Sequence, residues 1–335
     1  MLRKQTVKTT GWKTVTPRLY IGTGGFSVWY SNDLGQTFDR LWGSTGLYSE
    51  TRIWALNWHP DKPGEVLAGT DSGIHRLDVA SHKFEHMPSP MDAMQVWSIA
   101  RSPSNSDLIL AGTRPGALFR STDAGKSWKK IDAGIPETCL YVTYPRVTKI
   151  LFDPKDNNLV WLSLEVGGVY RSEDAGETWK MASAGLISDD VHDVGVMHNG
   201  GRVLFATTNE GLNISHDNGD SWKQQPFASK NPYTRTITPR ADEVGVAFVA
   251  NGDGPPGSWG RLLRTRDYGK HWENAGLPGD LQSSAWLVAT NPANPNLLFA
   301  CSALGQYFRS DDGGESWEAL PRRLTETRAL AWIPV

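Results

Sequence analysis

Four arginines carry the most specific chemistry in this sequence. A guanidinium group presents a planar fork of donors that binds carboxylate, sulfate or phosphate through two parallel hydrogen bonds. Several such groups around one point would form a site for a small anion. The alternative, which the sequence leaves open, is that they pair with local acids such as Glu50, Asp190 and Glu326 and only line a wet channel. The four are Arg52, Arg146, Arg235 and Arg328.

Three further residues are candidates for proton transfer. Glu165 stands where other copies of a repeat carry small or polar residues, and Asp253 lies in a long insertion. A carboxylate pair could hydrolyse a glycosidic bond, and His192 with a carboxylate could act as a general base. Alternatively, each one is an ordinary solvated loop residue.

Aromatic residues are the third group of candidates. Trp54, Trp97 and Trp286 could stack on a sugar or an aromatic ligand. Alternatively, their rings fill the space between neighbouring sheets. Tyr144, on a long loop, and Tyr233, close to Arg235, complete the set of predicted ligand-binding residues.

A repeat supplies the elements that must position these side chains. The pattern Ser/Thr-x-Asp-x-Gly-x-x-aromatic occurs six times, with its aspartates at Asp33, Asp123, Asp174, Asp217, Asp267 and Asp312. The number of residues between the first two aspartates is about twice that between the later ones. A degenerate seventh copy, Gly69–Asp78, lies inside this first interval. Units of this length fit one four-stranded blade of a β-propeller.

The sequence therefore predicts an all-β fold, a seven-bladed β-propeller that forms one domain over residues 1–335. The chain begins near a second strand at Leu19–Gly22, and its last segment, Thr327–Trp332, matches the innermost strand Thr51–Leu56. We therefore expect the C-terminal strand to complete the first blade and close the ring, which removes exposed sheet edges.

Aligning the innermost strands predicts two rings of side chains around the channel. The first ring, where the strands begin, is predicted to contain Arg52, Gln95, Arg146, Asp190, Tyr233, Ser284 and Arg328. The second ring, two residues further along each strand and on the same side, is predicted to contain Trp54, Trp97, Thr148, His192, Arg235, Trp286 and Leu330.

The repeated aspartates themselves are predicted to be structural. Six equivalent turns cannot all form one active site, whereas a carboxylate and a hydroxyl can hold a turn by bonding its backbone groups. The glycine of the pattern supplies a positive φ.

These repeats resemble the BNR/Asp-box family, and the resemblance covers nearly the whole chain. That family includes sialidases, xyloglucan-degrading glycosidases, sortilin-type receptors and the photosystem II stability/assembly factor. The resemblance implies a propeller that hosts either a glycosidase-like hydrolase or a protein-binding scaffold. We thus expect a sialidase-like propeller that binds a small anion, such as a sugar acid or another carboxylate, at the channel mouth. It would be a hydrolase or lyase; the alternative is a non-catalytic scaffold or assembly factor.

Composition narrows the range of partners. The net charge is −2, with acidic and basic residues mixed along the chain, so no nucleic-acid footprint is expected. No apolar run is long enough to span a membrane, and the basic start of the chain has no apolar run typical of a secretory signal. We expect a cytoplasmic monomer with no cofactor and no metal site, whose partner is a small anionic ligand or a protein.

Overall fold

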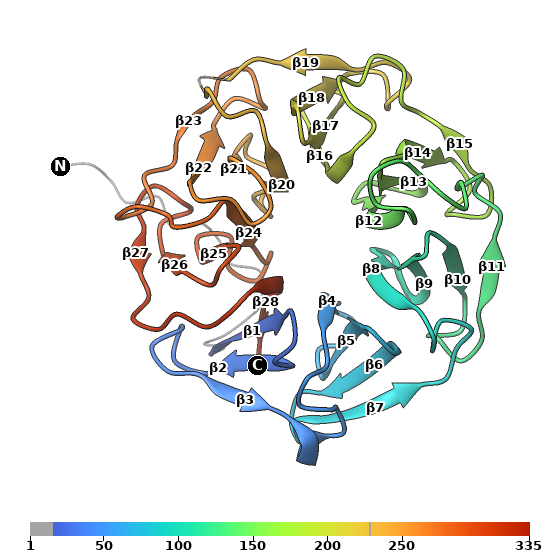
Figure 1. Cartoon of the computed structure of the whole chain (residues 1–335), viewed down its shortest axis with the longest axis vertical. Helices are drawn as coiled ribbons and strands as arrows, with labels where there is room; N and C mark the ends of the chain where they lie inside the picture. Colours follow the sequence, from blue (N-terminus) through green and yellow to red (C-terminus); the bar gives the residue numbers. More distant parts are fainter. Residues whose placement is uncertain (1–15, 228) are drawn as a thin grey trace.

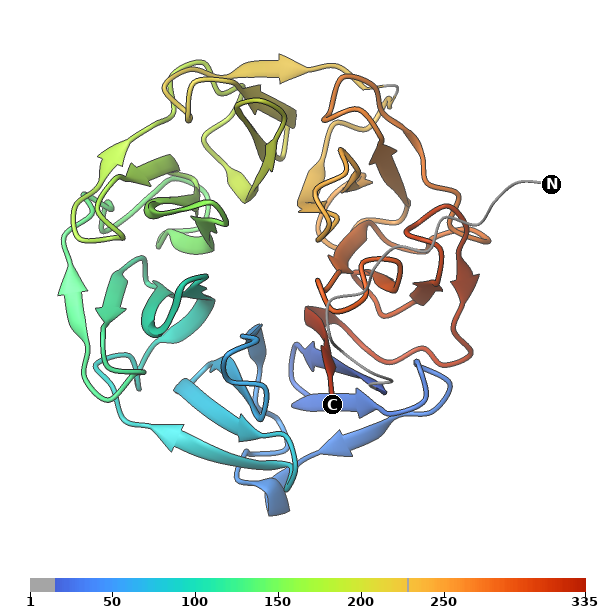
Figure 2. The ribbon, with the colours of Figure 1, turned by 180° about the vertical axis from the view of Figure 1, so that it is seen from behind.

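Seven four-stranded antiparallel sheets stand in a ring in the computed structural model, which describes residues 16–227 and 229–335. Figures 1 and 2 show this ring from its two faces, with the sheets arranged around a central opening. The prediction of seven blades is therefore confirmed. The assignment of residues 1–335 to one domain stays a prediction, and residues 1–15, where we expected no secretory signal, lie outside the described residues.

Each blade is built in the same order from the channel outwards. The first blade has β28 (Thr327–Pro334), β1 (Pro17–Thr23), β2 (Val28–Ser31) and β3 (Asp39–Leu41), and the 3-10 helix η1 (Gly43–Thr45) follows it. The second has β4 (Ile53–Trp58), β5 (Glu65–Thr70), β6 (Gly73–Asp78) and β7 (Lys83–Met87). The third has β8 (Gln95–Ser102), β9 (Asn105–Arg114), β10 (Leu118–Ser121) and β11 (Lys129–Ile131).

The remaining four blades continue this order along the chain. The fourth has β12 (Arg146–Asp153), β13 (Asp156–Glu165), β14 (Gly168–Ser172) and β15 (Lys180–Met181). The fifth has β16 (Val191–His198), β17 (Arg202–Thr208), β18 (Gly211–Ser215) and β19 (Lys223–Gln225). The sixth has β20 (Thr234–Pro239), β21 (Ala247–Gly252), β22 (Gly260–Thr265) and β23 (Glu273–Asn274). The seventh has β24 (Ala285–Ala289), β25 (Leu298–Ser302), β26 (Tyr307–Ser310) and β27 (Glu318–Ala319).

The second strand of each blade is largely buried. In β17, six consecutive residues from Val203 to Thr208 are buried, and in β25 all five residues are buried. Such a strand has a neighbouring blade against each of its faces, so it does not show the apolar–polar alternation of a half-exposed strand. The core is accordingly a series of clusters between adjacent blades.

The C-terminal strand closes the ring as predicted. β28 pairs antiparallel with β1, with Leu19 opposite Trp332 and Ile21 opposite Leu330. Trp332 is buried, and its Nε1 donates to the carbonyl oxygen of Leu297 in the seventh blade at 3.1 Å. Figure 1 places the C-terminus beside β1 and β2. The last strand thus joins the first blade to the seventh.

The Asp-box turns have the structural geometry that the repeat predicts. In the fourth blade, Asp174 accepts from the backbone N and the Oγ1 of Thr178 at 2.8 and 2.6 Å. Ser172 Oγ donates to Asp174 and accepts from the backbone N of Gly176 at 2.9 Å. Gly176 has a φ of 86°, which favours glycine. Every polar group of the pattern is therefore used to hold the turn.

Neighbouring blades are also linked at these turns. The arginine before the Ser of the motif reaches the next blade, since Arg120 Nε donates to the carbonyl oxygen of Ala175 at 3.1 Å. Arg171 donates to the carbonyl oxygen of Asn218 at 2.8 Å in the same way. Because the acceptor lies in the next Asp-box turn, each such arginine joins two repeats.

The second blade, which lacks the motif, uses a shorter turn. Asp78 ends β6 and accepts from both the backbone N and the Oγ of Ser81, at 2.7 and 2.6 Å. A local carboxylate thus still holds the turn between the outer strands, which explains why the degenerate copy keeps the blade without the motif.

Candidate functional site

Each innermost strand carries an irregularity close to its first residue. In six strands the pairing with the second strand skips one residue, as Trp54 is skipped between Ile53 and Ala55. In β20 the irregularity lies between Thr234 and Ile237 and includes Arg235. A bulge re-aims the extra side chain away from the pleat. The residues at these bulges are Trp54, Trp97, Thr148, His192, Arg235, Trp286 and Arg328.

This register confirms the predicted alignment in six blades and corrects it in the first. Thr327 pairs with Thr23 and Ala329 with Gly22, so Arg328 lies at the bulge and belongs to the second ring. Glu326, not Arg328, occupies the first-ring position, and Leu330 lies deeper. The prediction was wrong because it matched the Thr-Arg pairs of the two strands. The correct match aligns Ala55-Leu56-Asn57-Trp58 with Ala329-Leu330-Ala331-Trp332.

Hydrogen bonds between blades fix the positions of the bulges. Thr148 Oγ1 donates to the carbonyl oxygen of Val191 at 2.9 Å, and Thr236 Oγ1 donates to that of Trp286 at 2.8 Å. Thr207 Oγ1 donates to the carbonyl oxygen of Arg235 at 3.1 Å. The bulges of the fourth, sixth and seventh blades are therefore tied to a neighbouring blade. We define the channel mouth as the fourteen residues of the two corrected rings.

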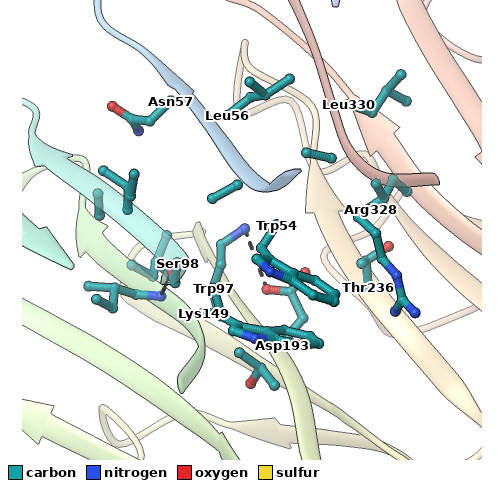
Figure 3. A pocket seen from close by; sticks show the side chains of 18 of the residues that line it. Trp54, Leu56, Asn57, Trp97, Ser98, Lys149, Asp193, Thr236, Arg328 and Leu330 are labelled. Atoms are coloured by element: carbon teal, nitrogen blue, oxygen red, sulfur yellow. Dashed lines mark hydrogen bonds and ion pairs between the residues drawn. The ribbon is translucent and has the colours of Figure 1, made fainter. Parts of the chain in front are cut away.

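Two of the four arginines flank a pair of stacked indoles. Trp54 and Trp97 have ring centroids 4.1 Å apart at an interplanar angle of 16°. The guanidinium of Arg328 lies 5.1 Å from the Trp54 centroid, and that of Arg146 lies 4.4 Å from the Trp97 centroid. Figure 3 shows Trp54, Trp97 and Arg328 grouped at one end of a pocket in the channel, which all three residues line. Because each indole has one face on the other, the two cations cover the outer faces.

These two arginines also have acidic partners. Arg146 forms an ion pair with Glu165, which ends β13 on the same blade. Arg328 forms one with Glu326, two residues before it. Part of their charge is therefore neutralised locally, as the wet-channel alternative expects.

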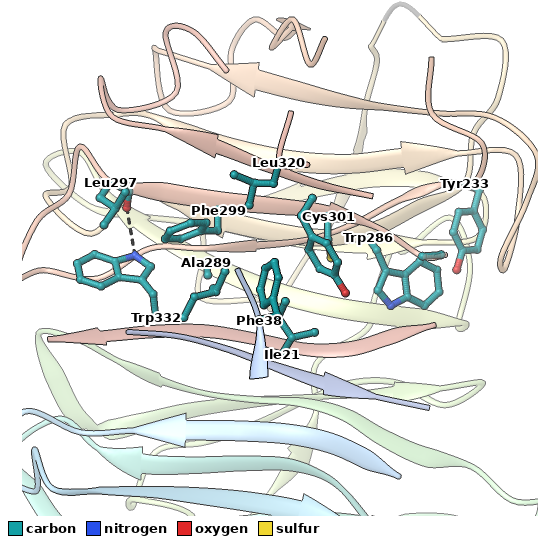
Figure 4. Close-up of a cluster of buried hydrophobic side chains, with 13 residues drawn as sticks. Ile21, Phe38, Tyr233, Trp286, Ala289, Leu297, Phe299, Cys301, Leu320 and Trp332 are labelled. Carbon is teal, nitrogen blue, oxygen red and sulfur yellow. Dashed lines mark hydrogen bonds between the residues drawn. The ribbon is translucent and has the colours of Figure 1, made fainter. Parts of the chain in front are cut away.

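Arg235 and Arg52 have a different environment. The guanidinium of Arg235 lies 4.4 Å from the ring centroid of Trp286, which is only 4% exposed. Both Trp286 and Tyr233 belong to a cluster of buried hydrophobic side chains. Figure 4 shows these two residues side by side at one end of the cluster, with Trp332 at the other end. Arg52 is exposed and lies opposite Gly24. Within residues 16–227 and 229–335, neither arginine forms an ion pair with a carboxylate.

The charges at the mouth influence one another. Burial lowers the pKa of Arg146 to about 9, with further lowering by the charges of Arg235, Arg114 and Arg328. Burial likewise lowers the pKa of Arg328; Glu326 opposes this effect, and Arg235 adds to it. Both guanidiniums remain protonated at neutral pH. Arg114, which ends β9, also belongs to this group; the sequence analysis missed it because it lies outside the aligned strands.

The predicted proton-transfer residues are occupied by structural contacts. Glu165 is bound to Arg146. Asp253 accepts from the backbone N and Oγ of Ser258, both at 2.8 Å, and from the backbone N of Trp259 at 3.0 Å, so it caps its own loop. His192 is 5% exposed, and its Nδ1 lies 2.6 Å from the carbonyl oxygen of Thr234.

Exposed apolar side chains are concentrated on the face around the mouth, which carries the turns between second and third strands and the loops between blades. The described part of the chain has twelve exposed large hydrophobic residues, and nine of them lie on this mouth face. The nine are Phe26, Trp42, Tyr48, Leu140, Tyr141, Tyr144, Ile187, Trp259 and Leu304. Only Val244 lies in a turn on the opposite face. Tyr144 thus belongs to an exposed loop surface.

The channel contains two cavities, of about 360 and 530 Å³, and the seven residues of the second ring belong to the lining of the first. Both are lined by Leu56, Lys149 and Leu330, so they lie in succession along the channel. Lys149 Nζ lies 3.5 Å from the buried carboxylate of Asp193 (Figure 3). No group of three or more potential metal ligands occurs in the parts of the chain that the structure describes, and no helix there is long and apolar enough to cross a membrane.

Comparisons with known proteins identify the same fold and repeat. The family model of the BNR/Asp-box repeat matches residues 308–319, which contain the last Asp box. Sortilin from Mus musculus is 23% identical over 265 residues, which cover 71% of this chain and 29% of that protein. The chain spans less than a third of the length of the first curated relatives that it matches.

Two solved structures show the likeness in three dimensions. A GH74 xyloglucanase from Xanthomonas campestris has a TM-score of 0.63 at 19% identity, over 90% of this chain and 46% of that one. A structure of YCF48 bound to D1 peptide has a TM-score of 0.55 at 13% identity, over 93% of this chain and 88% of that one. At these identities the likeness shows the fold alone.

Proposed function

We propose, from the premise that this chain is a seven-bladed β-propeller of Asp-box repeats, that it is a binding protein whose channel mouth captures a small carboxylate or related anion. The ligand would lie beside Arg235, which among the four predicted arginines is the one that is half-buried and forms no ion pair with a carboxylate in the described residues. Arg146, Arg328 and Arg52 would add to the field around it.

The excess of cations at the mouth is the observation that carries this proposal. In the described part of the chain, five arginines lie at or beside the mouth, Arg52, Arg114, Arg146, Arg235 and Arg328, and the acids that pair with them or act on them are Glu165, Asp190 and Glu326. Their mutual repulsion is reduced but not cancelled. An anion that enters the mouth would interact favourably with the uncompensated charge, most strongly where water is partly excluded.

The contacts of the acid–base candidates favour a non-catalytic function. A hydrolase or lyase would need a carboxylate free to donate or accept a proton. Glu165 is paired with Arg146, and Asp253 is committed to its own loop. The likeness to a xyloglucanase supports the fold and not the reaction.

A second candidate function, docking of a protein partner, is favoured by the apolar mouth face. Among the residues that the structure describes, nine of twelve exposed large hydrophobic side chains gather there, and exposed apolar patches are typical of interaction surfaces. The YCF48 structure contains a bound peptide. A segment of a partner protein that places a carboxylate over the mouth and apolar side chains against the loops would combine both proposed functions.

Calorimetric titration tests the first function. Acetate, sulfate and phosphate are titrated into the wild-type protein and into Arg235→Gln, with Arg266→Gln as the matched control. Arg266 is on the same blade but lies at the outer rim, where it pairs with Glu315 at 2.6 Å. We expect Arg235→Gln to weaken binding by roughly tenfold or more, the size of a charged hydrogen bond, and Arg266→Gln to leave it unchanged. Absence of binding, or equal binding by all three proteins, would contradict the proposal.

A peptide array tests the second candidate. Acidic peptides containing aromatic residues should bind the wild-type protein and lose binding to the double variant Leu140→Ser, Tyr141→Ser. Those two side chains are 72% and 94% exposed, so the variant should keep its stability. Peptides that bind both proteins equally would argue against the loop as a docking surface.

A further inference from the structure

Four residues on neighbouring blades form a two-by-two cluster at the mouth. Asp190 and Tyr233 stand at adjacent first-ring positions of the fifth and sixth blades, and His192 and Arg235 stand at the adjacent bulges below them. The rings of His192 and Tyr233 have centroids 4.9 Å apart. The cluster is therefore a compact unit that includes Arg235, which forms no ion pair with a carboxylate among the described residues.

The cluster contains a buried donor with nothing to bind. Tyr233 is 7% exposed, and its hydroxyl has no partner at hydrogen-bond distance among the described residues. A buried unpaired hydroxyl is costly, so its presence in a folded site requires an explanation. Burial raises the pKa of this hydroxyl, whereas the charge and the side-chain contact of Arg235 lower it, which places donor and cation on the same side of the mouth.

The cluster also contains two buried acceptors that face each other. Because a carbonyl oxygen can only accept, the 2.6 Å contact to Thr234 requires the proton of His192 on Nδ1. With that proton on Nδ1, the neutral imidazole presents Nε2 as an acceptor; burial lowers the pKa of His192 and so favours the neutral ring, although Asp190 opposes this effect. Asp190 Oδ1 lies 3.5 Å from that nitrogen and, in the described part of the structure, has no hydrogen-bond partner. A ligand that places a hydrogen-bond donor near both atoms would satisfy these two acceptors.

We propose that this cluster selects a carboxylate that carries a hydrogen-bond donor on the adjacent carbon, as in 2-hydroxy acids and 2-amino acids. The carboxylate accepts from the guanidinium of Arg235 and the hydroxyl of Tyr233. The neighbouring hydroxyl or ammonium donates to Asp190 and His192. This inference rests on the proposed anion-binding function and adds the class of ligand to it.

The chemical consequence is a preference that charge alone does not give. Acetate and glycolate carry the same charge and differ by one hydroxyl group. A site with unpaired buried acceptors discriminates strongly against the ligand that leaves them unpaired. Acetate would satisfy the cation but leave Asp190 and His192 without a donor, so glycolate should bind more tightly.

The test compares acetate, glycolate and glycine by calorimetry at neutral pH. We expect glycolate or glycine to bind at least tenfold more tightly than acetate, and the better of the two identifies the donor as hydroxyl or ammonium. Asp190→Ala should remove that preference while acetate binds as tightly as before or more tightly, because a negative charge is lost. If acetate binds as well as both other ligands, the inference is overturned and the anion-binding function stands. If no carboxylate binds, both fail.

Tyr233→Phe separates a ligand-binding role from a structural one. Removing an unpaired buried hydroxyl should leave the melting temperature unchanged or raise it, while binding of glycolate and acetate weakens severalfold. The matched control is Tyr170→Phe, since Tyr170 is also buried but donates to the carbonyl oxygen of Gly134 at 3.4 Å. That variant should lower the melting temperature and leave binding intact. A loss of stability in Tyr233→Phe with unchanged binding would refute the assignment.

Discussion

Trp54 and Trp97 stack at 4.1 Å across the boundary between the second and third blades, and a guanidinium covers each outer face of the pair. The indoles thus hold Arg328 and Arg146 at the mouth. The sequence left two roles open for these tryptophans, ligand stacking and packing between sheets. Because both faces of each indole are occupied by protein groups, packing accounts for their contacts.

Trp97→Ala should therefore damage both stability and the mouth. Trp97 is 7% exposed, and truncating a buried tryptophan costs about 3–5 kcal/mol. Chemical denaturation measures the loss, with Trp42→Ala as the control because Trp42 is 56% exposed. If the two variants lose the same free energy of unfolding, the stack does not stabilise the blades.

Asp174→Ala should reduce stability without affecting the mouth. The substitution removes the acceptor of four hydrogen bonds in one Asp-box turn, and the expected loss is about 1–3 kcal/mol. Thermal and urea unfolding measure it, and titration with acetate checks the mouth. Full stability combined with loss of anion binding would show that this aspartate is functional.

The Asp boxes should make stability depend on acid pH. Hydrogen bonds from the Ser127 side chain to Asp123, and from the Ser221 side chain to Asp217, lower the pKa of each carboxyl from 3.8 to about 2. A carboxyl whose pKa is lower in the folded state contributes stability that is present above its unfolded pKa and lost as the pH falls through the folded pKa. The free energy of unfolding should therefore decrease between about pH 4 and pH 2. In Asp123→Asn, the free energy of unfolding should decrease less steeply over this pH range. The same pH dependence in the variant and the wild-type protein would contradict the prediction.

Deletion of residues 326–335 should prevent stable folding. The deletion removes β28, the innermost strand of the first blade, and exposes the edge of β1. Circular dichroism and size-exclusion chromatography would show loss of the folded species. Deletion of Val335 alone, which lies beyond the last strand and is 43% exposed, is the control. A stable truncated protein would mean that ring closure is dispensable.

The sequence by itself determined the fold. Six Asp boxes and one degenerate copy predict seven blades because each box is a local turn whose bonds, such as those of Asp174 to Thr178, need no distant residue. Ring closure also followed from the sequence, since the first copy lacks an innermost strand and the chain ends in one.

Only the tertiary structure decided the composition of the mouth. Whether Arg328 stands at the first or the second ring depends on one bulge, and a shift of strand register changes what a side chain faces. The pairing of Arg146 with Glu165, the stacking of Trp54 on Trp97 and the unpaired hydroxyl of Tyr233 depend on contacts between strands and blades far apart in sequence. A repeat specifies its own turn, whereas the charge and hydrogen-bonding balance of a channel is set by side chains that meet only when the ring has closed.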